Sequence, residues 1–252
     1  MKEFLLPYGK ETLKADIEEE HLAGVLLSEL HSYKAPKSGA ELVQDALEHP
    51  IGSPRLCDIA VGKKKIVVIS SDHTRPVPSH IIMPLLLAEI RKGNPDAEIT
   101  ILISTGLHRG TKKEELESKF GKEITDKETI VVHDCDDKDN MVYIGKLPSG
   151  GNIILNRLAV EADLLVAEGF IEPHFFAGFS GGRKSVLPGV ASRETVMYNH
   201  NSAFIADPHA RTGVIEGNPI HNDMLYAARA ARLDFIINVV IDPKHDPIFA
   251  VA

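Results

Sequence analysis

Hydrophobic positions fall into short continuous runs that are separated by longer amphipathic stretches. The runs that are apolar at nearly every position are "KIVVISS" (65–71), "EITILIST" (98–105), "TIVVHD" (129–134), "DLLVAEGF" (163–170) and "DFIINVVI" (234–241). Strands buried on both faces have this pattern, and strands that alternate with helical segments form parallel sheets. The sequence therefore predicts an α/β fold, Rossmann-like, with a mainly parallel sheet and flanking helices.

Two segments between these runs carry helix signals. "SHIIMPLLLAEIRKG" (79–93) predicts a helix with Ser79 as its N-cap, bent or interrupted at Pro84. "TKKEELESKFG" (111–121) predicts a second helix, in which Thr111 and the glutamate three residues later form a capping box. These helices would connect the parallel strands.

The remaining segments predict smaller elements. "MVYIGKLPSGGNIILN" (141–156) is typical of a β-hairpin, and "NPIHNDMLYAARAARLD" (218–234) of a final helix. Residues 1 to about 60 predict short strands and a helix packed on the sheet rather than a separate domain. We expect residues 1–252 to form one main domain, and the strand that opens near residue 250 leads us to expect a part of a longer protein.

Composition and charge narrow the class of protein. The chain has 252 residues, of which 43% are hydrophobic and 25% charged, as in ordinary globular proteins. Its formal net charge of −8 argues against general nucleic-acid or membrane-surface binding, which needs a surplus of Lys and Arg. The two cysteines have no metal-ligand spacing, and no signal-peptide core or membrane span is evident. We expect a cytoplasmic protein without nucleic-acid or membrane partners.

Polar residues follow three of the predicted strands. Asp72 and Arg75 lie in "SDHTRPVP", His108 lies in "STGLHRG", and His174 and Lys184 lie in "EPHFFAGFSGGRKS". In an open parallel sheet, ligands bind where loops leave the carboxyl ends of the strands, so these residues should meet in one crevice. The arginine suits a carboxylate or phosphate. A structural alternative is that the histidines are solvated and that Asp72 only caps a helix or pairs with Arg75.

The glycine-rich segment before Lys184 resembles a phosphate-binding loop but departs from its pattern. Counting from Gly178, the position of the second glycine holds Arg183. Gly178, Gly181 and Gly182 still permit a backbone nest for an anion, to which Arg183 and Lys184 would add charge. Lys184 is either a point charge or a nucleophile bonded to a cofactor. The alternatives are a non-catalytic nucleotide- or metal-binding module and a pyridoxal phosphate-dependent racemase.

Taken together, these motifs resemble the nickel-pincer lactate racemase family. The resemblance rests on "SDHTRPVP", "STGLHRG", "EGFIEPHFFAGFSGGRKSVLPGVAS" and "YNHNS", in this order, and extends from about residue 65 to 240. It implies a pyridinium mononucleotide with two thioacid-type groups, the nickel-pincer nucleotide, joined covalently to Lys184. It also implies that His200 binds the nickel ion, that His108 and His174 are acid and base, and that Asp72 and Arg75 contact cofactor and substrate.

The resemblance implies a nickel-dependent racemase or epimerase of a small 2-hydroxy acid, with lactate as the first expectation. It further implies partners that build the cofactor and insert nickel, and a C-terminal domain beyond the segment studied, without which we expect weak activity or none. The chemistry is consistent with this reading, because the C–H bond next to a carboxylate is poorly acidic. Transfer of a hydride to the cofactor avoids that difficulty, while one histidine on each side handles the hydroxyl proton.

Overall fold

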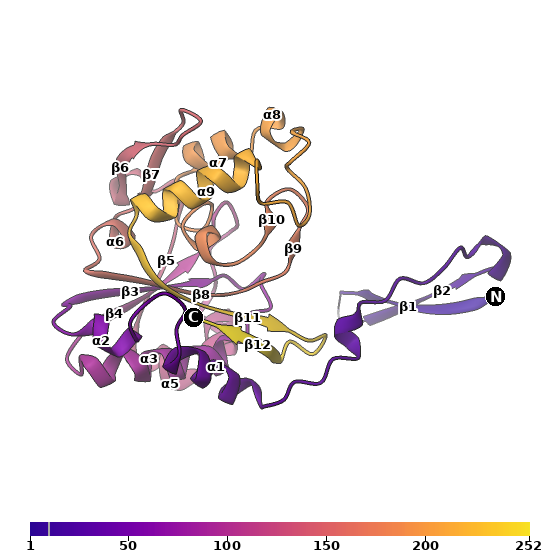
Figure 1. Cartoon of the computed structure of the whole chain (residues 1–252), viewed down its shortest axis with the longest axis horizontal. Helices are drawn as coiled ribbons and strands as arrows, with labels where there is room; N and C mark the ends of the chain where they lie inside the picture. Colours follow the sequence, from indigo (N-terminus) through magenta and orange to yellow (C-terminus); the bar gives the residue numbers. More distant parts are fainter. Residues whose placement is uncertain (10) are drawn as a thin grey trace. The chain divides into compact units, whose positions relative to one another are not determined.

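The structure, a computed structural model, describes residues 1–9 and 11–252, which divide into two compact units, Met1–Lys34 and Ala35–Ala252. The larger unit is built on a six-stranded sheet of order β12-β11-β8-β3-β4-β5, in which all neighbours are parallel except the β11–β12 pair (Figure 1). Its strands are β3 (Lys65–Ser71), β4 (Glu98–Ser104), β5 (Thr129–Val132), β8 (Leu164–Phe170), β11 (Leu233–Ile241) and β12 (Pro247–Val251). The predicted fold class is confirmed.

Helices cover both faces of this sheet (Figure 1). One face carries α1 (Gly39–Glu48), α2 (Leu56–Ala60), α3 (Ser79–Gly93), α4 (Lys113–Phe120) and α5 (Lys122–Lys127). The other face carries α6 (Arg157–Val160), the 3-10 turn η4 (Gly182–Ser185), α7 (Arg193–Asn199) and α9 (Pro219–Ala230). The remaining elements are η3 (Lys138–Asn140), α8 (Ser202–Ile205), and the pairs β6 (Met141–Lys146) with β7 (Asn152–Asn156) and β9 (Pro173–His174) with β10 (Gly178–Phe179).

The central strand β3 shows why the continuous apolar runs become buried strands. Successive side chains of a strand point to opposite faces. Ile66 and Val68 accordingly belong to the core beneath α1–α5, whereas Val67 and Ile69 belong to the core beneath η4, α7 and α9. A strand sandwiched between two cores can be apolar at every position. All five predicted strands form, but β5 lies at the edge of the sheet and has no buried residue, so its predicted burial on both faces is wrong.

The local helix signals were less reliable than the strand runs. Ser79 is the first residue of α3 rather than its N-cap, and its hydroxyl donates to Glu168 instead. Pro84 lies inside α3 and does not interrupt it. The capping prediction for Thr111 is wrong as well, because the helix begins at Lys113 and the Thr111 hydroxyl bonds to the His73 ring. For Ser79 and Thr111, a tertiary hydrogen bond takes the side chain that the local signal had assigned to the helix backbone.

The smaller unit contains an antiparallel hairpin of β1 (Lys2–Tyr8) and β2 (Glu11–Ile17), followed by the turns η1 (Glu19–His21) and η2 (Glu29–His31). None of its side chains whose exposure is described is buried. In the larger unit, α1 and α2 contribute to the core, as predicted for a helix within residues 1 to about 60. Among the described helices, none has the length and apolar character needed to cross a bilayer.

Candidate active site

A cavity of about 350 Å³ lies at the carboxyl ends of β3, β4 and β8. The loops around it are tied together, since the Gly106 amide donates to the carbonyl of Gly189 at 3.0 Å. The predicted site residues that line the cavity are Asp72, Arg75, His108, His174, Gly181, Lys184 and His200. The expected convergence of three strand ends on one crevice is thus confirmed, and His200 joins them from the end of α7.

His108 is held by an aspartate from the neighbouring loop. Its Nδ1 lies 2.6 Å from Oδ2 of Asp72, which is buried, while Thr74 donates to Oδ1 of Asp72 from its amide and its hydroxyl. Although burial opposes it, the hydrogen bonds from Thr74 and His108 hold the pKa of Asp72 below its usual value. A carboxylate accepts only, so Nδ1 of His108 carries the proton and Nε2 of the neutral ring is left as an acceptor.

His174 has the opposite arrangement. Its Nδ1 accepts hydrogen bonds from the backbone amides of Phe176 at 3.4 Å and Ala177 at 3.2 Å. The neutral ring therefore carries its proton on Nε2. Burial, followed by the positive charges of Lys184 and Arg75, lowers the pKa of His174 to about 4. Both histidines thus bond to the protein through Nδ1 and leave Nε2 free, but Nε2 is an acceptor in His108 and a donor in His174.

Lys184 lies in a region of excess positive charge. Burial, with the nearby guanidinium groups of Arg183 and Arg75, lowers the pKa of Lys184 to about 7, and the carboxylate of Glu172 opposes this only weakly. At neutral pH about half of the molecules carry the uncharged amine, which is the nucleophilic form. The Arg75 guanidinium has no ion-pair partner within residues 1–9 and 11–252 and is exposed to an anionic ligand.

Arg183 does not line the cavity, and its side chain is folded into the glycine-rich loop. Its guanidinium donates to the carbonyls of Ala177 (2.9 Å) and Phe179 (3.0 Å), and more weakly to those of Ser180 and Gly181 (both 3.4 Å). Its Nε donates to Nδ1 of His221 in α9 at 3.0 Å. Burial lowers the pKa of Arg183 to about 10, and the group stays charged. We had expected Arg183 to contact the cofactor; in this geometry it instead fixes the loop from inside.

The three glycines of this loop, Gly178, Gly181 and Gly182, differ in what they contact. Gly181 lines the cavity with φ of 79°, and a Cβ there would lie 2.7 Å from Oδ1 of Asn238. Gly182 lies beside it, but its amide already donates to that same oxygen at 3.2 Å. Gly178 packs against the carbonyl of Val214, where a Cβ would approach to 2.5 Å. The expected nest for an anion is therefore partly occupied by the protein itself, and only Gly181 faces the ligand space.

His200 has the features expected of a metal ligand. It is the C-cap of α7, whose N-cap Ser192 accepts from the Thr195 amide. Burial, then the charge of Lys184, lowers the pKa of His200 to about 4, so the ring is neutral and able to coordinate. Its Nδ1 is buried without a hydrogen-bond partner among the described residues. Neutral imidazole suits nickel, and the neutral amine of Lys184 suits acylation, so both residues fit a tethered nickel cofactor.

Residues absent from the sequence predictions also shape this site. The Phe176 ring packs edge-on against His174 (4.6 Å between centroids) and against His200 (5.1 Å), and it lies 5.9 Å from Nζ of Lys184. Glu168 lines the cavity with one buried oxygen that has no hydrogen-bond partner among the described residues. The aromatic pair in "PHFFAG" was a visible signal for Phe176; Glu168, inside an apolar strand, was a weaker one.

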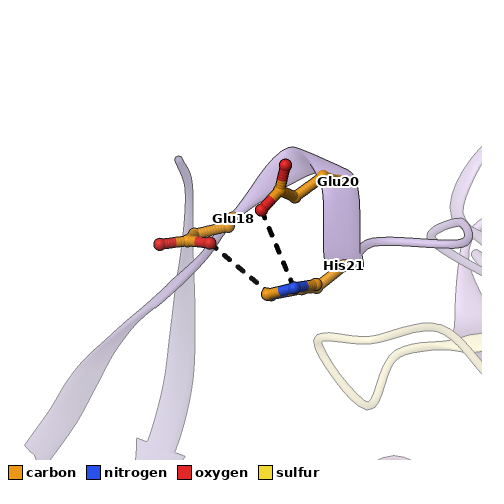
Figure 2. A group of neighbouring side chains, drawn as sticks. All are labelled: Glu18, Glu20 and His21. Carbon is orange, nitrogen blue, oxygen red and sulfur yellow. Dashed lines mark ion pairs between the residues drawn. The ribbon is translucent and has the colours of Figure 1, made fainter.

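Other groups of potential metal ligands lie outside this cavity. Glu18, Glu20 and His21 lie together on the smaller unit, with His21 ring nitrogens 3.6 and 3.8 Å from the two carboxylates (Figure 2). All three side chains are exposed. A second group comprises residues 134–136, where Asp136 is already paired with Arg193 at 2.7 Å. Exposed acidic groups are strongly hydrated, and neither group is assigned a metal.

A parallel α/β sheet with a cavity at its carboxyl edge, lined by two histidines with opposite tautomers and a lysine of lowered pKa, defines a ligand-binding domain of the α/β class. Comparison with known proteins specifies the family. The model of the lactate racemase N-terminal domain matches residues 8–213, and the chain belongs to this family.

The chain is 59% identical over 247 residues to a lactate racemase of Thermoanaerobacterium thermosaccharolyticum, covering 98% of this chain and 58% of the relative. It is 57% identical over 237 residues to a lactate racemase of Lactiplantibacillus plantarum, covering 94% and 56%. The chain thus spans a little over half the length of these curated relatives.

Two solved structures share the fold. The lactate racemase apoprotein of T. thermosaccharolyticum superposes with a TM-score of 0.90 at 56% identity, over 99% of this chain and 58% of that one. A Thermotoga maritima protein superposes with a TM-score of 0.66 at 24% identity, over 84% of this chain and 53% of its own, and shows the fold alone.

Proposed function

We propose that this chain forms the cofactor-binding and proton-transfer part of a 2-hydroxy acid racemase or epimerase, with lactate as its substrate. The observation that carries the proposal is the single cavity in which His108, His174, Lys184 and His200 meet, in a chain of the lactate racemase N-terminal domain family. The names of the relatives support the choice of lactate.

Each residue has a separate task in this proposal. Lys184 attaches the cofactor, because its amine is partly uncharged, and His200 binds the nickel ion. When bound, the nickel-pincer mononucleotide supplies an acceptor for the hydride of the substrate carbon. Arg75, whose guanidinium is accessible from the cavity, pairs with a carboxylate or phosphate. Asp72 acts through His108 rather than on the ligand, since both of its oxygens are already used.

Proton transfer then falls to the two histidines. Loss of the hydroxyl proton and of the carbon-bound hydride leaves a planar 2-keto acid, and return of the hydride to its other face gives the opposite hand. His108 enters as the proton acceptor, because Asp72 leaves its Nε2 unprotonated. His174 starts with a proton on Nε2, which donates a hydrogen bond to a substrate oxygen. The ring must gain a second proton before it can give one to the substrate.

A change in the positive charge around His174 would make that proton easier to gain. Lys184 is the largest electrostatic cause of its low pKa after burial. Acylation of Lys184 converts the amine to an uncharged amide, and an anionic ligand offsets the charge of Arg75. Both changes raise the pKa of His174 toward its ordinary range, and a second proton, taken from solvent, would bind Nδ1 as the amide hydrogen bonds from Phe176 and Ala177 break. Loading of the site therefore activates the second histidine.

We further propose that the protein works in the cytoplasm and depends on enzymes that build the cofactor and on a nickel inserter. Both cysteines, Cys57 and Cys135, are free thiols, which accords with a reducing compartment. Attachment of the mononucleotide requires an activated acyl group, because a free carboxylate or thiocarboxylate does not acylate an amine unaided. A dedicated supply of the activated cofactor follows from that chemistry.

Elemental analysis and intact mass test the proposal directly. The protein is produced in cells that also make the cofactor-building enzymes and the nickel inserter, with the L. plantarum racemase as the loading control. We expect nickel and an added mass that peptide mapping locates on Lys184, both lost in Lys184→Ala. Nickel-free protein of unmodified mass, in cells that load the control enzyme, would contradict the proposal.

A further inference from the structure

The hairpin of the smaller unit has one apolar and one polar face. In its register Phe4 lies opposite Ala15, Leu6 opposite Leu13, and Lys2 opposite Ile17. Residues that pair across an antiparallel ladder share a face, and alternate residues share it along each strand. The apolar face of the hairpin, as named below, therefore carries Phe4, Leu6, Tyr8, Leu13, Ala15 and Ile17, with the charged residues Lys2 and Glu11 at its ends.

The opposite face is polar. It carries Glu3, Leu5, Pro7, Thr12, Lys14 and Asp16, and Lys14 pairs with Glu3 across the strands at 2.9 Å. Antiparallel sheets with this alternation normally pack one face on a core and leave the other in water. The alternating pattern of the hairpin is thus typical of a sheet whose apolar face is covered.

Within the smaller unit, no described residue covers that face. Half of the Leu6 side chain is exposed, with 66% for Tyr8, 47% for Leu13 and 37% for Ile17. A two-stranded hairpin is marginally stable in water, and contiguous exposed apolar groups mark an interaction site. The hairpin therefore requires a partner for its apolar face.

The size of the face argues against a second copy of the chain as that partner. Seven residues per strand at about 3.4 Å, across two strands about 5 Å apart, give a face of roughly 250 Å². A stable dimer needs about 800 Å² from each partner. A face this small can bind a partner stably only if the partner is tethered to it, because a tether raises the effective concentration of the partner.

A tethered partner exists in the relatives. The T. thermosaccharolyticum racemase has 42% of its length (100% less the 58% covered) outside the region that matches this chain, and its solved structure matches 99% of this chain, hairpin included. We propose that the apolar face of the hairpin is the docking surface for this remaining part of the racemase chain. The hairpin would thereby join the two parts of the enzyme. The proposal rests on family membership and is independent of the catalytic assignments.

Hydrogen exchange of the hairpin amides tests this docking. Two chains are compared: residues 1–252 alone, and a fused chain in which the remaining part of the T. thermosaccharolyticum racemase follows residue 252. We expect amides of β1 and β2 to exchange about 100-fold more slowly or better in the fused chain. Equal exchange in the two chains would overturn the proposal, as would slow exchange in residues 1–252 accompanied by a dimer mass in light scattering.

Adjacent leucines on opposite faces provide the matched variants. Leu6→Lys places a charge on the apolar face, whereas Leu5→Lys places the same charge on the polar face, where Leu5 is 62% exposed. In the fused chain Leu6→Lys should abolish the slow exchange and lower the melting temperature, and Leu5→Lys should do neither. In residues 1–252 alone both variants should melt like the parent, which establishes that each still folds. Equal effects of the two substitutions in the fused chain would contradict docking on this face.

Discussion

The surroundings of His108 and His174 differ in the group that hydrogen-bonds to ring nitrogen Nδ1. The loop after β3 gives His108 the buried carboxylate of Asp72, whose Oδ2 lies 2.6 Å from Nδ1 and fixes a proton there. The loop after β8 gives His174 two backbone amides, which fix a lone pair there instead. At His174, burial and the cationic neighbours also lower the pKa of the ring.

This difference shows that a symmetrical reaction does not require symmetrical residues. Racemisation interconverts two molecules of equal free energy, and either hand must find both an acceptor and a donor. In the reaction that we propose, unlike histidines would satisfy that need from the start, since both line the cavity, where Nε2 of His108 would accept and Nε2 of His174 would donate a hydrogen bond. Two histidines that both had the tautomer of His108 would both act as acceptors, and neither would donate a hydrogen bond to a substrate oxygen.

Removing either histidine should give the largest effect. In the cofactor-loaded fused chain, His108→Ala and His174→Ala should each lower kcat about 10²–10⁴-fold, because a positioned acid or base is lost. Nickel content and the mass on Lys184 should be unchanged. His80→Ala, on the exposed side of α3, is the matched control. Because the enantiomers have equal free energy, the loss in kcat/KM must be the same from either hand. Turnover that survives in one of the two variants would break the comparison.

Replacing the carboxylate beside His108 should have an intermediate effect. Asp72→Asn keeps the shape but offers an amide, which can donate to Nδ1 and so move the His108 proton to Nε2. We expect a loss of about 10–100-fold in kcat, as is typical when the partner of a functional histidine is changed. Activity within twofold of the parent would show that Asp72 does not set the state of His108. Steady-state kinetics on protein of matched nickel content decides this.

The smallest expected effect is on stability, and it concerns His174. Its pKa is about 4 in the folded chain and 6.5 as a model value, so between these values the unfolded chain binds more protons. Stability should therefore fall as the pH is lowered from 6.5 to 4. In His174→Gln this fall should be shallower by a few degrees in melting temperature, at about 2–4 °C per kcal/mol. Thermal melts across this window, parallel in both proteins, would disprove the shift.

The architecture could be predicted from the sequence because burial on two faces leaves a simple pattern. The run from Ile66 to Ile69 is apolar at each position, and its side chains divide between two cores. The meeting of His108, His174 and Lys184 followed from the same source, since parallel strands bring their carboxyl ends to one edge. The pairing of Asp72 with Thr74 two residues later had a local signature too, because Asp commonly accepts from the amide at that spacing.

The contacts of Arg183 could not be predicted in this way. A glycine-rich loop with two cations suggests an anion, and nothing local reveals that four carbonyls of the same loop turn inward to the guanidinium. Its remaining partner, His221, is 38 residues away in sequence. Long-range side-chain bonds depend on the assembled fold, and a single sequence does not encode them as a pattern.

The central claim is that the two histidines hold opposite tautomers, and ¹⁵N NMR of histidine-labelled residues 1–252 tests it most directly. Spectra recorded above about pH 8, where imidazole is neutral, distinguish a protonated Nδ1 from a protonated Nε2, and His108→Gln and His174→Gln assign the signals. The account predicts Nδ1–H for His108 and Nε2–H for His174. The same tautomer in both rings would contradict it.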